Sequence, residues 1–260
     1  MVKSNYTFGD SDEASRRLQN LAKLYEPDTR SLLKRSEVHS PLLAVDLGCG
    51  PGWSTRLIQE VLSPQQTVGL DSSARYIDEA RERYGETIEF KLHDITQVPF
   101  PMHSPNVMFC RFLLTHLPSP GKVLAHWKQV VAQTGALLLI HETESLESKN
   151  PSLRRYYELV GQLQEHYGQN LWIGAVLETC LKQAGWSVVD SIGLVLEKPA
   201  QSMAELHLAN IRSWRNDEYA SKSFDANEIN SLEASLGRIA CGMDNAGVVL
   251  NTARQIIARF

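Results

Sequence analysis

The sequence predicts an α/β protein in which a doubly wound, seven-stranded and mostly parallel sheet carries a helical lid. From Leu42 to His141, short β-type runs alternate with helical patterns, and this alternation is typical of a parallel sheet with helices on both faces. Segments 145–173 and 200–248 are too long for ordinary connections, so we expect a helical cover over the sheet's carboxyl edge. With 260 residues, 43% of them apolar, the chain can bury a full core.

The first half should contain five strands and four helices. Strands are expected at 42–47, 67–70, 88–92, 106–110 and 136–140, where apolar or alternating runs are bounded by turn residues. Helices are expected at 10–35, 54–62, 72–85 and 122–131. Asp10 should cap the first helix because Glu13 follows at capping-box spacing. Ser72 should cap the third and Gly85 should end it.

The second half should contain longer helical segments and two more strands. Asn150 can cap a helix over 150–168, with Pro151 at its first position and Gly168 at its end. The remaining elements are expected at 174–185 (helix), 186–196 (strand), 203–214 and 227–241 (helices) and 253–260 (strand). We therefore divide the chain into three parts: an N-terminal helical cap (1–40), a ligand-binding core (41–145), and lid segments interleaved with the last core helix and strands (146–260).

The composition of the chain limits the kinds of partner that we expect it to bind. The net charge of −4 gives no overall attraction to nucleic acid or to an anionic membrane. No apolar run approaches the roughly 18 residues of a membrane span, and the N-terminus lacks the apolar stretch of a signal peptide. The four cysteines are widely spaced without a C-x-x-C pair, which fits reduced thiols in the cytoplasm better than zinc or disulfides. We expect a cytoplasmic monomer or homodimer without a bound metal.

The stretch VDLGCGPGW, Val45–Trp53, follows the first expected strand. In an open α/β sheet, ligands bind beyond the carboxyl ends of the strands. Gly48, Gly50 and Gly52 let the backbone turn tightly and expose bare main chain to a ligand, while Asp46 favours a cationic group such as an ammonium. The spacing G-x-G-x-G differs from the dinucleotide motif G-x-G-x-x-G, and no phosphate-binding G-x-x-x-x-G-K-[ST] is present. The alternative is that these glycines form a turn with a purely structural role.

Two further acids lie at the ends of the next two strands. Asp71 ends the second strand, where an acid can accept both hydroxyls of a ribose. Asp94 ends the third strand, where it could accept from an exocyclic amine while Ile95 packs on a flat base. Each has an ordinary alternative, because Asp71 or Ser72 could cap a helix and Asp94 could belong to a turn. Acids at three successive strand ends are harder to explain as three unrelated turns.

This constellation resembles the class I S-adenosylmethionine-dependent methyltransferases. The resemblance covers roughly residues 40–145 through VDLGCGPGW, GLDSS, HDIT, NVMFCRFLLTHLPSP and QTGALLLIHE, with IGAVLETCLKQAGW resembling a later helix. It implies a Rossmann-like fold, S-adenosyl-L-methionine as methyl donor and S-adenosyl-L-homocysteine as product. The cofactor-binding residues that it implies are Asp46, Gly48, Cys49, Gly50, Asp71, Ser72, Asp94, Ile95, Cys110 and Arg111.

Within this implied set, the backbone at Gly48 and at Cys110–Arg111 would hold the methionine moiety, and Asp46 would face its ammonium. By analogy with similar enzymes, the N-terminal segment is expected to close over the cofactor. There Tyr6 or Phe8 could face the sulfonium through a cation–π contact, and Arg16 or Arg17 could pair with the methionine carboxylate. A solvated amphipathic helix is the alternative for this segment.

Two histidines are candidate catalytic bases. His116 lies in LLTHLPSP and His141 ends the fifth strand, and imidazole titrates near neutrality. Glu142 is a further candidate. Each has an ordinary alternative as a loop-orienting or strand-end hydrogen-bonding residue, and a base is needed only when the acceptor arrives protonated.

The favoured function is methyl transfer to the oxygen, nitrogen, sulfur or carbon of a small molecule. At the end of the fourth strand, the sequence CRFL stands where family members that methylate the planar amines of nucleobases or glutamine amides carry an acidic or amide residue followed by Pro-Pro-Tyr/Phe, so those substrates are less expected. A macromolecular (RNA or protein) methyltransferase and a cofactor-binding protein without methyl transfer are the alternatives. The glycine spacing disfavours a nicotinamide oxidoreductase. Lid aromatics such as Tyr156 and Tyr157 either line a substrate pocket or pack the lid's core.

Overall fold

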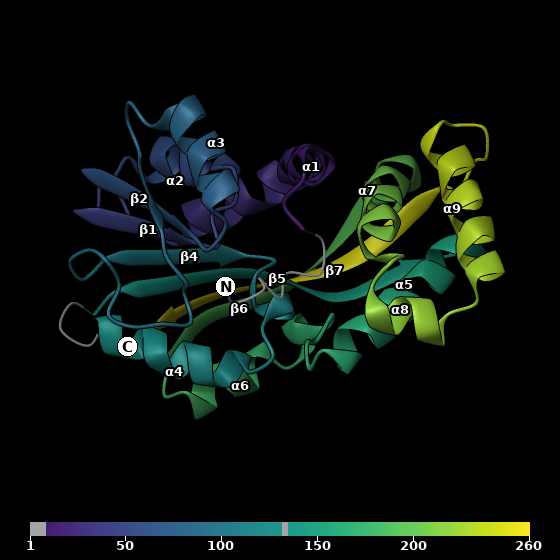
Figure 1. The fold of residues 1–260 in the computed structure, drawn as a ribbon. Coiled ribbons are helices and arrows are strands. Elements are labelled where there is room, and N and C mark those ends of the chain that lie inside the picture. The colour runs from purple at the N-terminus through teal and green to yellow at the C-terminus, as the bar shows by residue number, and fades with distance from the viewer. Residues whose placement is uncertain (1–8, 132–134) are drawn as a thin grey trace.

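The computed structural model describes residues 9–131 and 135–260, which form a seven-stranded sheet flanked by helices (Figure 1). The strand order is β3-β2-β1-β4-β5-β7-β6. The first five strands are parallel, and β7 runs antiparallel to both of its neighbours. The predicted fold class is therefore confirmed. The strands are β1 (Leu43–Leu47), β2 (Gln66–Asp71), β3 (Glu89–Leu92), β4 (Val107–Arg111), β5 (Leu137–Ser148), β6 (Ser187–Pro199) and β7 (Val248–Arg259).

The helices of the described residues agree with the sequence pattern apart from their caps and three short elements. Ser11, not Asp10, caps α1, and Ser73, not Ser72, caps α3, because these hydroxyls accept from the N–H groups three residues on. Asn150 caps α5 as predicted. The short elements α8, η1 and η2 were not predicted. The helices are α1 (Asp12–Arg35), α2 (Trp53–Leu62), α3 (Ala74–Tyr84), α4 (Pro120–Val131), α5 (Pro151–His166), α6 (Leu177–Gln183), α7 (Ala200–Trp214), α8 (Glu218–Ser223) and α9 (Ala226–Ala240), with 3₁₀ turns η1 (Leu114–His116) and η2 (Ile173–Ala175).

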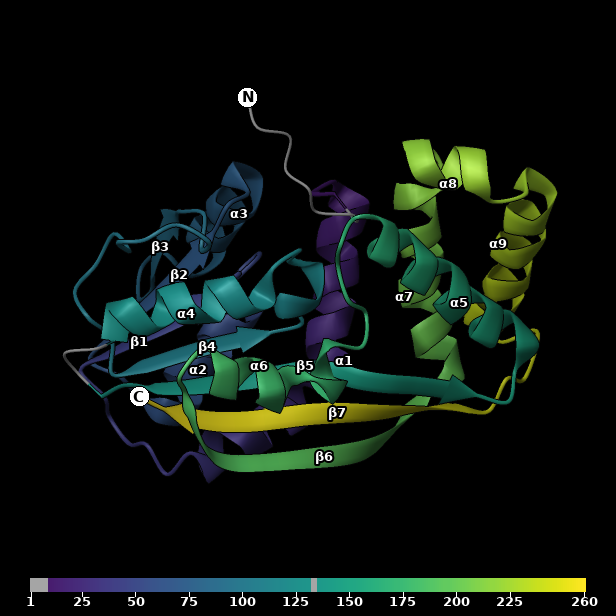
Figure 2. The same ribbon diagram turned by 90° about the horizontal axis from the view of Figure 1, so that it is seen from below.

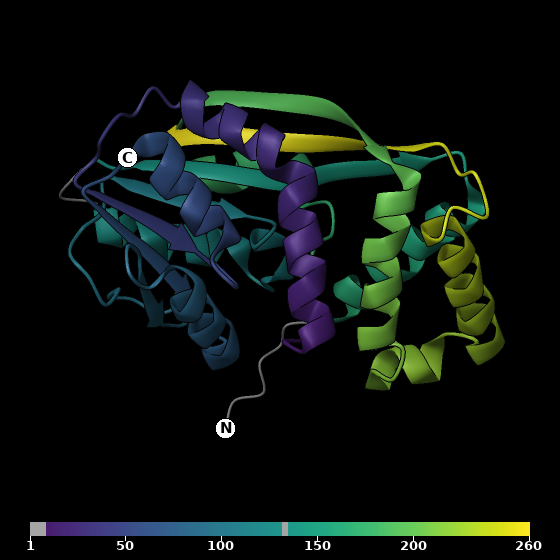
Figure 3. The ribbon, with the colours of Figure 1, turned by 90° about the horizontal axis from the view of Figure 1, so that it is seen from above.

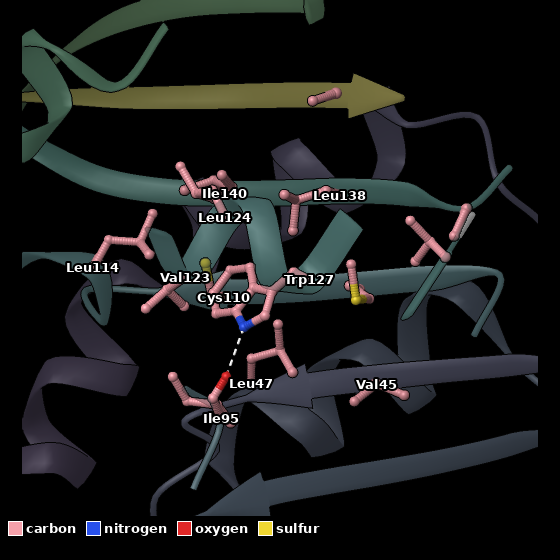
Figure 4. Packing of buried hydrophobic residues seen from close by; sticks show 14 of the residues in the cluster. Val45, Leu47, Ile95, Cys110, Leu114, Val123, Leu124, Trp127, Leu138 and Ile140 are labelled. Atoms are coloured by element: carbon pink, nitrogen blue, oxygen red, sulfur yellow. Dashed lines mark hydrogen bonds between the residues drawn. The ribbon is translucent and has the colours of Figure 1, made fainter. Parts of the chain in front are cut away.

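Apolar clusters cover both faces of the sheet. On one face, α4 and α6 pack over β1, β4 and β5, and the fully buried Trp127 donates its indole N–H to the Ile95 carbonyl over 2.8 Å (Figure 4). On the other face, Leu32 and Leu33 of α1 join α2 against the same strands. Sheet residues alternate between these clusters, so neighbours in one strand serve opposite faces. Cys110 thus faces α4, while Arg111 points toward α1.

Three strands are longer than predicted and carry the lid. The expected fifth strand ended at Ile140, but β5 continues to Ser148, and β7 begins at Val248 rather than Ala253. These extensions lack the continuous apolar run of a buried strand, and their pairing with each other decides their conformation. Figure 2 shows β5, β6 and β7 running out to α5, α7, α8 and α9. The four helices enclose a separate apolar core, so the predicted helical cover is present.

Helix α1 lies between the core and the lid (Figure 3). Its C-terminal half packs on the sheet, and the helix also contacts α7. Near its middle, Asp28 accepts from Lys198 Nζ over 2.6 Å, and both side chains are largely buried. This pair fixes α1 to the end of β6, where helix α7 begins. Within the described ranges, no helix is long and apolar enough to cross a membrane. The proposed division at residues 40 and 145 stays a prediction.

Candidate functional site

The glycine turn after β1 lies at the carboxyl edge of the sheet, where the strand order reverses between β1 and β4. Such a switch point is the usual ligand position in open α/β sheets. Gly48, Gly50 and Gly52 have φ values of 68°, 52° and 87°, in the left-handed region where a side chain is strained. The predicted tight turn is therefore present, and glycine is needed at each of these positions.

Asp71 at the end of β2 holds this turn in place. Its Oδ2 accepts from the Gly50 N–H over 2.8 Å, and its Oδ1 accepts from the Ser73 N–H over 2.8 Å. Burial raises the pKa of this carboxyl, while the backbone donors oppose the rise. Each carboxylate oxygen accepts up to two hydrogen bonds, so both oxygens retain capacity for a ligand.

Asp46 in β1 is buried and bonded to the start of α2. Its Oδ2 accepts from Ser54 Oγ over 2.6 Å and from Thr55 Oγ1 over 2.7 Å. Burial raises the pKa of Asp46 to about 6; the two hydroxyls and then the positive charge of Arg111 oppose this rise. The side chain thus anchors the helix that follows the glycine turn, and its predicted role toward an ammonium group stays a prediction.

The remaining members of the predicted cofactor set lie around the same edge. Asp94 is exposed and its Oδ1 accepts from the N–H and hydroxyl of Thr96, while the neighbouring Ile95 is buried. Ser72 is exposed beside Asp71.

The thiols of Cys49 and Cys110 are buried in apolar clusters, so only their main chain can face a ligand. The structure thus brings Asp46, Asp71 and the glycine turn together but directs both thiols away.

Arg111 ends β4 on the face covered by α1. Its guanidinium donates to Thr29 Oγ1 over 3.0 Å and lines a cavity of about 130 Å³ between α1 and α2. Lys23, Glu26 and Arg56 line the same cavity. The cation is thus directed toward α1 and away from the apolar face of α4.

The loop after β4 is held in an unusual conformation. Phe112 has a φ of 50°, which is uncommon for a bulky residue, and its ring lies 4.9 Å from that of Tyr25. Glu142 fixes the following residues, because its Oε1 accepts from the N–H groups of Leu113 and Leu114 over 2.8 and 2.7 Å. The sequence suggested Glu142 only as an alternative base, so its contact with this loop was missed.

The two candidate bases lie on different sides of this loop. His116 in η1 has its Nδ1 3.5 Å from Gln164 Nε2 of α5, and desolvation together with the charge of Arg17 lowers its pKa to about 3. His141 is fully buried, with Nδ1 3.4 Å from Thr29 Oγ1. Burial, reinforced by the charge of Arg111, also lowers the pKa of His141. Both rings are therefore neutral and weakly basic at pH 7, and their catalytic roles stay predictions.

Gly48 gives a direct test of the turn. A methyl group at this position would lie 2.6 Å from Leu113 Cδ1 and would require a positive φ. We expect Gly48→Ala to lower the free energy of unfolding by about 1–2 kcal/mol, measured by urea denaturation. Gly161→Ala is the control, because this glycine lies inside α5 with open space around it. It should raise stability by about 0.5–1 kcal/mol. Equal effects at both positions would contradict the strain argument.

Sequence reasoning also missed a set of polar residues inside the lid. His207 and Asn210 lie on the buried face of α7 among Met203, Ile211 and Trp214. Polar side chains at helical spacing within an apolar stripe were the available signal. Tyr6 and Phe8, the residues suggested to face a sulfonium, lie outside the described residues.

Comparison with known proteins shows which family this part of the chain resembles. Residues 45–139 match the methyltransferase domain family. A trans-aconitate 2-methyltransferase of Methylobacterium radiotolerans is 34% identical over 106 residues, which span 41% of this chain and 40% of that protein. The corresponding Methylobacterium nodulans protein is 32% identical over 124 residues, or 48% and 47% of the two chains. These matches span less than half the length of either relative.

Solved structures extend the likeness to most of the fold. A Haemonchus contortus phosphoethanolamine N-methyltransferase 2, solved with S-adenosyl-L-methionine, has a TM-score of 0.59 at 17% identity, covering 99% of this chain and 60% of that one. A geranyl diphosphate C-methyltransferase of Streptomyces coelicolor has a TM-score of 0.55 at 14% identity, covering 91% and 76%. At these identities the likeness establishes the fold alone. Residues 45–139 therefore match a methyltransferase domain, and the fold of the chain is similar to that of these solved methyltransferases.

Proposed function

We propose that this protein transfers a methyl group from S-adenosyl-L-methionine to a small-molecule acceptor bound between the core and the lid. The observation that carries this proposal is Asp71, half-buried beside the glycine turn with capacity left on both oxygens. That arrangement fits the two hydroxyls of a ribose. The match of residues 45–139 to the methyltransferase domain supports the same assignment.

The residues present fit the rest of this ligand. Backbone at Gly48 and Gly50 is bare, so a ligand can lie against it, and the exposed Asp94 lies at the same edge. The positive φ values at the glycine turn leave no room for a Cβ without strain. When bound, S-adenosyl-L-methionine supplies an electrophilic methyl group on its sulfonium. The protein's part is to orient the acceptor in line with that methyl group and to exclude water.

A small acceptor is favoured over RNA or protein. The net charge is −4, and the lid lies beyond the carboxyl edge of the sheet. The relatives named for trans-aconitate and the structure named for geranyl diphosphate support a small acceptor. We place the protein in a reducing compartment such as the cytoplasm, because its four cysteines are unpaired.

Two measurements test the proposal. Calorimetric titration with S-adenosyl-L-methionine and S-adenosyl-L-homocysteine should give dissociation constants in the micromolar range. Transfer of a labelled methyl group should then be followed with a panel of small acceptors that includes trans-aconitate. Absence of binding by the folded protein would refute the proposal. Tight binding without transfer to any acceptor would instead favour a cofactor-binding protein without methyl transfer.

A further inference from the structure

Helices α1 and α2 border a cavity of about 130 Å³ that lies next to the glycine turn. Trp53, which lines the cavity, is the first residue of α2 and directly follows Gly52 of the turn, while Arg111 lines it from the end of β4. A single water needs about 10–15 Å³, so the cavity has room for a phosphate-sized ion. The other lining residues are Ala22, Lys23, Glu26, Arg56 and Leu57.

The Arg111 guanidinium brings a poorly balanced positive charge to this cavity. It donates to the neutral Thr29 hydroxyl over 3.0 Å and forms no ion pair with any residue that the structure describes. Burial lowers the pKa of Arg111, and the negative charge of Asp46 opposes that fall. A guanidinium carries five N–H donors, so Arg111 has donors left for a ligand.

The two acids nearest to α1 and α2 in this region are already paired. Glu26 accepts from Arg30 over 2.9 Å and lies 3.9 Å from Arg56. Glu60 lies 3.3 Å from Arg30 and also pairs with Arg56. Two arginines therefore share two glutamates. Lys23 is exposed on α1, and neither an ion pair nor a hydrogen bond joins its ammonium group to the described part of the chain.

The cavity is therefore positive in a chain whose net charge is −4. Arg111 and Lys23 remain after the paired groups, and they outnumber Asp46. Its walls include the buried apolar Leu57, and a wall of low polarity strengthens the attraction between a charge and its partner. The indole N–H of Trp53 has no hydrogen-bond partner among the described residues. Cations and an N–H donor of this kind fit a carboxylate or a phosphate, which arginine binds through paired hydrogen bonds.

We propose that this cavity binds a small oxyanion, a carboxylate or a phosphate, through Arg111 and Lys23. Two sources supply this chemistry: the methionine carboxylate of S-adenosyl-L-methionine, and a free anion such as phosphate. Only the first source rests on the proposed methyl transfer. In either case the bound oxyanion joins the end of β4 to α1 beside the start of α2, and so holds together segments that border the glycine turn.

Calorimetric titration with sodium phosphate and with sodium acetate tests the site, with sodium chloride added to keep the ionic strength constant. We expect saturable binding by the unmodified protein. Arg111→Met keeps most of the side-chain volume and should raise the dissociation constant for phosphate at least about tenfold, because it removes charge-assisted hydrogen bonds. Lys23→Met should raise it about threefold, because this cation is exposed.

Lys122→Met is the matched control. Lys122 is an exposed lysine of α4, on the opposite face of the sheet, so its loss should leave phosphate binding unchanged. Circular dichroism must show that Arg111→Met is folded at the titration temperature. Because Lys23 is exposed, Lys23→Met should fold in any case, and an unchanged dissociation constant in this variant would contradict the assignment of Lys23.

Titration with S-adenosyl-L-methionine and with 5′-methylthioadenosine, which lacks the amino acid, distinguishes the two sources. If the methionine carboxylate occupies the cavity, saturating phosphate and the Arg111→Met substitution should both weaken binding of S-adenosyl-L-methionine and leave that of 5′-methylthioadenosine unchanged. If a free anion occupies it, phosphate should bind alongside both ligands. Either result supports an oxyanion site and identifies its occupant.

Two results would overturn the inference while methyl transfer stands. One is the absence of phosphate and acetate binding together with unchanged S-adenosyl-L-methionine binding by the folded Arg111 and Lys23 variants. The other is phosphate binding of equal strength in the Arg111, Lys23 and Lys122 variants, which would place the anion elsewhere. Absence of S-adenosyl-L-methionine binding by the unmodified protein would instead refute the proposed function, and phosphate binding that depends on Arg111 would still establish the oxyanion site.

Discussion

Replacement of Asp71 by alanine should weaken S-adenosyl-L-methionine binding by at least about 100-fold. The carboxylate is proposed to accept two ribose hydroxyls, and a hydrogen bond to a charged group contributes about 1.5–3 kcal/mol. The substitution also removes the acceptor for the N–H groups of Gly50 and Ser73, so the glycine turn loses its attachment to β2. Isothermal titration calorimetry of both proteins measures the effect.

Asp78→Ala is the matched control. Asp78 lies on the neighbouring helix α3 with a side chain that is 78% exposed, so its removal should change the dissociation constant by less than twofold. Circular dichroism must show that the Asp71 variant is folded at the titration temperature. Normal binding by a folded Asp71→Ala protein would remove the ribose assignment and the main support for the proposed function.

Glu142 should make the protein less stable as the pH rises toward 8. Burial raises the pKa of this carboxyl from 4.5 to about 8, and the N–H groups of Leu114 and Leu113 oppose the rise only in part. Between these values the folded state binds a proton that the unfolded chain has lost. The free energy of unfolding therefore falls with increasing pH across this window. Urea denaturation at pH values from 5 to 9 measures the slope.

Two variants isolate this contribution from those of Asp46 and Asp71, whose pKa values are also raised. Glu142→Gln cannot ionise but keeps an oxygen for Leu113 and Leu114, so it should be more stable than the unmodified protein at pH 9. Glu142→Ala leaves both N–H groups without their acceptor and should cost about 2–4 kcal/mol at pH 6. Glu147→Gln is the control at an exposed position of the same strand. It should change neither the free energy of unfolding at pH 6 nor its slope with pH. A Glu142→Gln curve parallel to that of the unmodified protein would contradict the argument.

The strands and turns of the core could be predicted because the sequence patterns that specify them are local. A buried parallel strand appears in the sequence as an apolar run, and a turn at positive φ requires glycine, so VDLGCGPGW predicted the strand and the tight turn without any contact information. The placement of Asp71 at a strand end follows from the same alternation. The extensions of β5 and β7 were not predictable, because their half-polar sequence becomes a strand only when each pairs with its neighbour.

The roles of individual polar side chains depended on contacts between distant segments. The sequence presented His116, His141 and Glu142 as three similar candidates for one base. In the structure, Glu142 accepts from the loop after β4, His141 is enclosed against α1, and His116 approaches α5. Burial and neighbouring charges move their pKa values in directions that no sequence pattern encodes.

Sequence alone determined the strand–helix order, the glycine turn and the acids at the strand ends, because local periodicity and backbone sterics specify them. The tertiary structure decided which polar groups share a site. It placed His207 and Asn210 of α7 against Tyr157 and Tyr156 of α5, and it buried the thiols of Cys49 and Cys110 in apolar clusters. These outcomes depend on burial and on long-range pairing, which are properties of the packed chain and not of any one segment.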